Sequence, residues 1–190
     1  MSEPEAYPGG IAYDFKSWRD ESMTLKHAAE VLWKRYYRVW QGAAEGKGFK
    51  TSEPILLDLR LVGPALLLTG LALENLAKAV RVALNQDVPS IISDGHKLGK
   101  HFDQAQIQLT QRQHDILRDL TKAIEWSGKY PTSKRELNRK NRHIPFPVLQ
   151  AGEVFNDKNI LAILTRNGEE IEEIWEKAAE RLRAIGKRTP

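Results

Sequence analysis

The feature that most constrains the fold is an apolar stretch long enough to form a single helix. From Pro64 to Leu84 most positions are Leu, Ala or Val, so apolar side chains surround nearly the whole circumference of the predicted helix. Such a helix has to be buried by other elements. We predict that it is the central helix of the fold, beginning near Thr51-Ser52-Glu53-Pro54 and running to about Asn85. Pro64 predicts either a kink or a restart within it.

The sequence before and after this stretch shows helical periodicity, which predicts further helices that can cover the central one. Apolar residues recur at spacings of three, four or seven positions from Phe15 to Trp40, and they keep one helical face again from Ile160 to Ile185. Between them, capping and apolar patterns predict two shorter helices, at 98–109 and 111–128, after a loop at 87–94.

These patterns together define the expected architecture. Strand-like alternation occurs only at 143–148, and Asn167-Gly168 leaves open whether the C-terminal helix is one helix or two. A chain of 190 residues fits one domain. We therefore predict an all-α, up-and-down bundle of about five helices spanning 1–190. A flexible N-terminal segment, 1–12, precedes it, and a long irregular basic loop with prolines, 129–156, follows the fourth helix.

Composition narrows the classes of protein. Hydrophobic residues make up 41% and charged residues 28%, as in globular domains. The absence of cysteine excludes disulfides, thiolate zinc sites, iron–sulfur clusters and a cysteine nucleophile, and it suits a reducing cytosol. Met1–Gly10 has no apolar run for a signal peptide, and Leu61–Leu73 is shorter than the roughly 20 residues of a membrane span. We expect a cytoplasmic location and no membrane partner.

Three short segments follow one another in the order of a known family. They are Ala72–Lys78 (ALENLAK), Gly95–Leu98 (GHKL) and Trp126–Pro131 (WSGKYP). In this order they resemble the HEPN superfamily, in particular its bacterial HEPN-like proteins, over about Pro54–Pro131. The resemblance implies a helical bundle that recognises RNA, a nucleotide or a partner protein in a stress or phage-defence setting.

Polar residues of these segments form a candidate cluster. Glu74 and Lys78 lie one helical turn apart on a largely apolar helix, where an unpaired charge is costly to bury. We expect them to meet His96, Trp126 and Tyr130 if the ends of the third and fourth helices converge on the central one. Two interpretations stay open: a polar cluster that fixes helix packing, or a ligand-binding or catalytic cluster.

The nuclease motif of the HEPN family is missing. HEPN ribonucleases resemble one another in an Arg that precedes a His with four to six residues between them. Here seven residues separate Arg135 from His143, and three separate Arg139 from His143. A metal-independent ribonuclease that uses His143 with Arg135 or Arg139 in an unusual arrangement remains as an alternative, because proton transfer depends on geometry rather than on linear spacing.

The densest run of positive charge lies in the predicted loop. Its cations, opposed by a single acid, Glu136, are Lys129, Lys134, Arg135, Arg139, Lys140 and Arg142. Such a run can neutralise phosphates while nearby aromatic rings stack on bases, which predicts a nucleic-acid-binding segment. The alternative is a solvated loop without a partner.

Histidine spacing argues against a metal site. His96 and His101 are five residues apart, and no His-Glu-x-x-His pattern occurs, so we predict no metal and no cofactor. The leading hypothesis is a non-catalytic HEPN-like binding or regulatory module, with RNA or a nucleotide as ligand and a second copy or another protein as partner. The alternatives are the ribonuclease above and a purely structural protein-interaction domain.

Overall fold

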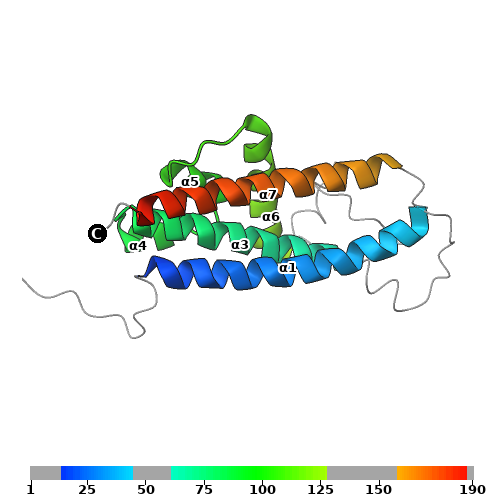
Figure 1. Cartoon of the computed structure of the whole chain (residues 1–190), viewed down its shortest axis with the longest axis horizontal. Helices are drawn as coiled ribbons and strands as arrows, with labels where there is room; N and C mark the ends of the chain where they lie inside the picture. Colours follow the sequence, from blue (N-terminus) through cyan, green and yellow to red (C-terminus); the bar gives the residue numbers. More distant parts are fainter. Residues whose placement is uncertain (1–13, 45–60, 128–157, 188–190) are drawn as a thin grey trace, which may run out of the picture.

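The chain is a bundle of helices arranged around one central helix (Figure 1). The computed structural model describes residues 14–44, 61–127 and 158–187. Within these ranges there are six helices and no strand, which confirms the predicted all-α bundle. The helices are α1 (Phe15–Ala44), α3 (Val62–Ala83), α4 (Val88–Ser93), α5 (Leu98–Gln104), α6 (Gln111–Ser127) and α7 (Lys158–Gly186).

Helix α3 occupies the centre, as its apolar sequence predicts. It packs against α1, α5, α6 and α7. Leu73, Ala77 and Val80 on α3 are fully buried, together with Leu117 on α6 and Ile174 on α7. Because the surrounding helices each direct one apolar face toward α3, a single core forms along it.

A glycine sets how closely α3 and α6 approach. A Cβ atom built on Gly70 would stand 2.8 Å from Cγ1 of Ile124 and 3.4 Å from the carbonyl oxygen of Leu120. Any larger residue would therefore collide with α6. The missing side chain lets the two helices pack in direct contact at this point.

The ends of α3 differ in part from the sequence prediction. Residues 51–60, predicted as its first turns, lie outside the described residues. The helix begins at Val62, so Pro64 lies in its first turn, where a missing N–H is tolerated. At the other end Asn85 has a positive φ of 57°, and the amide of Gln86 donates to the carbonyl of Arg81. This reversal ends α3 where the sequence predicted.

The prediction of a loop at 87–94 is wrong, because most of this segment forms helix α4. Asp87 is the N-cap of this helix, and its carboxylate accepts a hydrogen bond of 3.0 Å from the amide of Ser90. Pro89 lies in the first turn, where its fixed φ favours a helix. Asp-Val-Pro-Ser is thus a helix start rather than a loop.

The observed bounds of α5 and α7 make the sequence prediction more precise. Helix α5 ends at Gln104 rather than at residue 109, because Gln106 has a positive φ of 57° and the amide of Ile107 turns back to the carbonyl of Phe102. Helix α7 is continuous through Asn167-Gly168, which answers the question of one helix or two.

The predicted segments 1–12 and 129–156 lie outside the described residues. In the described ranges, no helix combines the length and apolar character that crossing a membrane requires.

Candidate functional site

Three ionisable side chains lie along one face of the central helix. Glu74, Lys78 and Arg81 are separated by four and three residues, which places them on the same side of α3. They are buried, with 2%, 7% and 2% of their surface exposed. Because a buried charge is costly unless it is paired, the partners of these groups determine what the site can do.

Glu74 holds the first part of the cluster together. Its carboxylate contacts Nζ of Lys78 at 2.6 Å through one oxygen and Nδ1 of His96 at 2.9 Å through the other. Lys78 also stands over the ring of Trp18 on α1, 5.0 Å from the ring centre. The His96 side chain is 47% exposed, whereas that of Glu74 is 3% exposed. A buried carboxylate therefore joins α3 to the loop before α5.

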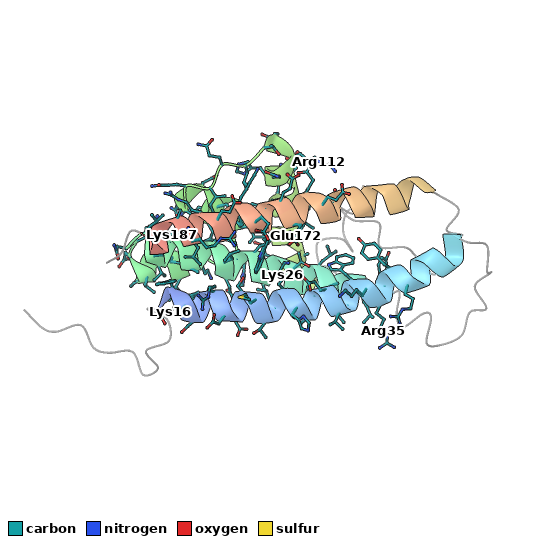
Figure 2. All side chains as sticks on the ribbon, in the orientation of Figure 1. Lys16, Lys26, Arg35, Arg112, Glu172 and Lys187 are labelled. Atoms are coloured by element: carbon teal, nitrogen blue, oxygen red, sulfur yellow. The ribbon has the colours of Figure 1, made fainter. Side chains whose placement is uncertain are left out.

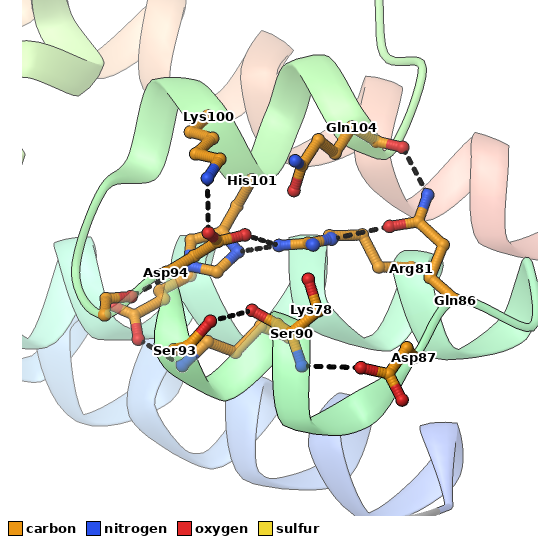
Figure 3. A network of polar contacts seen from close by, with 12 residues as sticks. Lys78, Arg81, Gln86, Asp87, Ser90, Ser93, Asp94, Lys100, His101 and Gln104 are labelled. Atoms are coloured by element: carbon orange, nitrogen blue, oxygen red, sulfur yellow. Dashed lines mark hydrogen bonds and ion pairs between the residues drawn. The ribbon is translucent and has the colours of Figure 1, made fainter.

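Arg81 holds the second part together, and Figure 3 shows its guanidinium surrounded by partners from the C-cap of α4, from α5 and from the turn after α3. Its Nη1 atom donates to Asp94 at 2.8 Å and lies 2.7 Å from Nδ1 of His101, and its Nε atom donates to Gln86 at 2.8 Å. Lys100 donates to the other oxygen of Asp94. The cluster thus ties three consecutive helices together.

The contacts of His101 define its protonation state. An arginine can only donate, so Nδ1 of His101 must accept from Arg81 and carries no proton. Nε2 then donates to the carbonyl of Gly95 at 2.8 Å. Burial lowers the pKa of His101 below its ordinary value of 6.5, and the positive charges of Lys78 and Arg81 lower it further, although Gly95 and Glu74 act in the opposite direction. His101 is therefore a neutral structural group.

The charge of Asp94 is stabilised by its neighbours. The hydrogen bond from Lys100 lowers the pKa of Asp94, burial opposes this effect, and the hydrogen bond from Arg81 lowers the pKa again, so that the net change is downward. Asp94 thus carries its negative charge between two cations at neutral pH.

The predicted site residues separate into two groups. Glu74, Lys78 and His96 are in contact with one another. Trp126 belongs to the last turn of α6, and its side chain lies outside the described part. The other predicted residues all fall in the range 128–157, which is also outside it: Lys129, Tyr130, Lys134, Arg135, Arg139, Lys140, Arg142 and His143.

Sequence reasoning missed the residues at the centre of the second part, namely Arg81, Asp94 and His101. One signal for Arg81 was present, because it continues the spacing of Glu74 and Lys78 on the same helix face. No comparable signal exists for Asp94 and His101. Their approach to Arg81 depends on how α4 and α5 fold back over α3.

A separate cleft of about 240 Å³ lies between α1, α3 and α7. Trp33 and Tyr37 line it from α1, and Trp175 lines it from α7. Leu66 and Leu73 line it from α3. The cleft is therefore largely apolar, with aromatic rings on two opposing helices. Its existence was not predicted, because it forms between helices that are distant in the sequence.

Charged residues also line this cleft. Figure 2 shows Lys26 of α1 and Glu172 of α7 facing one another between the two helices, and their side chains are 2.9 Å apart. Lys26 also pairs with Glu30 at 3.0 Å and lies over the ring of Trp175. Burial alone would lower the Lys26 pKa, but its bonds to Glu172 and Glu30 outweigh this effect and raise it. This ion pair bridges α1 and α7.

Comparisons with known proteins identify no family. No family model matches the chain, and no curated protein or solved structure matches it significantly. The resemblance to HEPN proteins therefore stays a prediction from the three sequence segments.

The contacts limit what the polar cluster can do chemically. Within the described residues, no group of three or more His, Asp and Glu side chains can hold a metal ion. Glu74 orients His96 through Nδ1, which is how a carboxylate prepares a histidine for proton transfer. The other ionisable groups of the cluster bind one another. The arrangement is thus chiefly a scaffold that holds α4 and α5 on α3.

Proposed function

We propose that this chain is a non-catalytic module that binds single-stranded RNA. The observation that carries the proposal is the exposed positive charge in the second half of α1. Lys34, Arg35 and Arg38 are exposed, and no acidic residue occurs between Val31 and Ala44. Figure 2 shows Arg35 directed away from the bundle. Exposed cations of this density attract phosphates, as do the positively charged grooves that follow the backbone of single-stranded nucleic acids.

Two further points support the proposal. The sequence contains a second basic run, 129–142, which adds phosphate-binding capacity to a chain of net charge +4. The mutually paired residues of the polar cluster favour a structural over a catalytic role for it. The setting in stress response or phage defence rests on the resemblance to HEPN proteins alone.

Charge reversal tests the RNA-binding surface. We expect the purified chain to bind a fluorescent single-stranded RNA of mixed sequence, with an affinity that falls steeply with salt concentration. The double variant Arg35→Glu/Arg38→Glu should weaken binding by on the order of tenfold or more, since each lost phosphate contact removes counterion release.

The matched control carries the same change in charge elsewhere. In Lys16→Glu/Lys187→Glu each substitution changes the charge by two, so both double variants lower the net charge from +4 to 0. Lys16 and Lys187 lie at the end of the bundle opposite to Arg35 (Figure 2). Equal weakening in both double variants would contradict a specific surface on α1. Thermal melting of each variant establishes that the fold is retained.

The same RNA tests the absence of catalysis. After prolonged incubation in EDTA we expect the RNA to remain intact. Cleavage that disappears in His96→Ala or in His143→Ala, but not in His27→Ala as a distant control, would instead support the ribonuclease alternative.

A further inference from the structure

Beyond RNA binding, we propose that the cleft between α1, α3 and α7 binds a small amphipathic carboxylate, with the apolar body inside and the carboxylate at Lys34. The inference shares Lys34 with the proposed RNA-binding surface, but it is argued from the lining and the charges of the cleft.

The interior of the cleft favours an apolar body. Trp33, Leu66 and Trp175 line it, and the one hydroxyl group among its lining residues on α3, that of Thr69, is already used. This hydroxyl accepts from Nε1 of Trp33 at 3.1 Å and donates to the carbonyl of Ala65 at 2.8 Å. Against this α3 wall a nucleobase would leave its polar edge without partners, which is costly, whereas a hydrocarbon chain or ring would not.

The volume limits the size of the ligand. Pockets for drug-sized ligands usually measure about 300–1,000 Å³. At about 240 Å³ the cleft is smaller, and it suits one short chain or one small ring system.

The charged residues that line the cleft indicate where the carboxylate of the ligand binds. Lys26 and Lys34 both line the cleft, but Lys26 already pairs with Glu30 and Glu172. Lys34 has no ion-pair partner among the residues that the structure describes. A negative group would be repelled by the two acids near Lys26 and attracted to Lys34, so the carboxylate is assigned to the Lys34 end.

Matched ligands test this assignment on the unmodified protein of 190 residues. Calorimetric titration compares three ligands: octanoate, octanol and AMP. Octanoate and octanol carry the same hydrocarbon chain with and without a charged head group, and AMP represents a nucleotide. We expect octanoate to bind, octanol to bind up to about fivefold more weakly, and AMP to show no competition with octanoate. In Lys34→Gln the preference for octanoate over octanol should disappear. A titration with 2-naphthoate then distinguishes a ring from a chain as the preferred body.

A substitution in the cleft wall provides the second test. Gly168 lines the cleft, and a Cβ atom there would meet only the hydroxyl of Tyr37, at 4.0 Å. Gly168→Leu can therefore fill the cleft without a clash at Cβ, and it should weaken octanoate binding by on the order of tenfold or more. Gly186→Leu makes the same change in the same helix, where a Cβ meets nothing within 4 Å, and should leave binding unchanged.

Several outcomes would overturn the proposal: absence of octanoate binding, equal binding in both leucine variants, a charge preference that survives Lys34→Gln, or displacement of octanoate by AMP. Amide chemical shifts of the unmodified chain titrated with octanoate give an answer independent of any variant. The shifts should concentrate on the cleft residues Ala29, Ala72 and Gly168. Gly168→Leu should leave RNA binding intact, so failure of one proposal is distinguishable from failure of the other.

Discussion

Nη1 of Arg81 lies 2.7 Å from Nδ1 of His101, and this contact requires the histidine to be neutral. If the ring took up a second proton, Nδ1 would carry a hydrogen that points at the donor Nη1 of Arg81. Two cations would then stand side by side in a buried position. Arg81 cannot give up its proton at ordinary pH, so His101 is the member of the pair that responds to acid.

The stability of the fold should therefore depend on pH below neutrality. Because the pKa of His101 is lower in the folded than in the unfolded chain, the unfolded chain binds more protons as the pH falls below 6.5. The contribution of His101 to the stability of the fold is fully present above pH 6.5, and it is lost as the pH falls from there toward the lowered pKa. Between pH 7.5 and 5.5 we expect the melting temperature to fall, and the fall to be smaller in His101→Gln, which keeps one accepting and one donating atom. Identical pH profiles of the two proteins would contradict this account.

Asp94 should be far more important for stability than the lysine that pairs with it. The Asp94 side chain is 6% exposed and the Arg81 side chain 2%, so Asp94→Ala leaves a buried guanidinium without its counter-charge. We expect a loss of about 3–5 kcal/mol in the free energy of unfolding. Lys100 is 47% exposed, and Lys100→Ala should cost about 1 kcal/mol or less. Urea denaturation of both variants measures the difference, and comparable losses would show that the buried pair is not the source of stability.

Gly70 should tolerate no branched side chain. In Gly70→Val the new atoms collide with Ile124 and approach the backbone of α6, so we expect a loss of about 1–3 kcal/mol despite the better helix propensity. Gly63 lies on the same helix, and a Cβ there meets nothing within 4 Å. Gly63→Ala should be neutral, or stabilise by up to about 1 kcal/mol. Thermal or urea unfolding compares the two, and a neutral Gly70→Val would show that α3 and α6 can separate at no cost.

Local patterns were sufficient to predict most of the helices. The all-round apolar surface of 64–84 identified α3 as the central helix, and periodicity identified α1, α6 and α7. The errors lie where short-range chemistry overrode the pattern. Asp87 caps a helix in a segment predicted as a loop, and Gln106 takes a left-handed conformation inside a segment predicted as a helix. Such turns depend on a few hydrogen bonds that periodicity does not report.

The candidate site was only partly predictable. Glu74 and Lys78 are neighbours because of their spacing on one helix, and His96 was associated with them through the family resemblance rather than through its spacing. The partners of Arg81 carry no such signal, since Asp94 and His101 reach it only after α4 and α5 fold back. The cleft could not be predicted either, because its aromatic walls come from α1 and α7, which are more than 100 residues apart in the sequence.

The amino-acid sequence by itself determined the class of this protein: a cysteine-free bundle of helices around one apolar helix that carries charges along a single face. Only the tertiary structure decided which groups neutralise those charges and where an open cleft remains. The reason is physical. Helix formation depends on side chains within a few turns, whereas the pairing of buried charges and the gaps between helices depend on packing between distant segments.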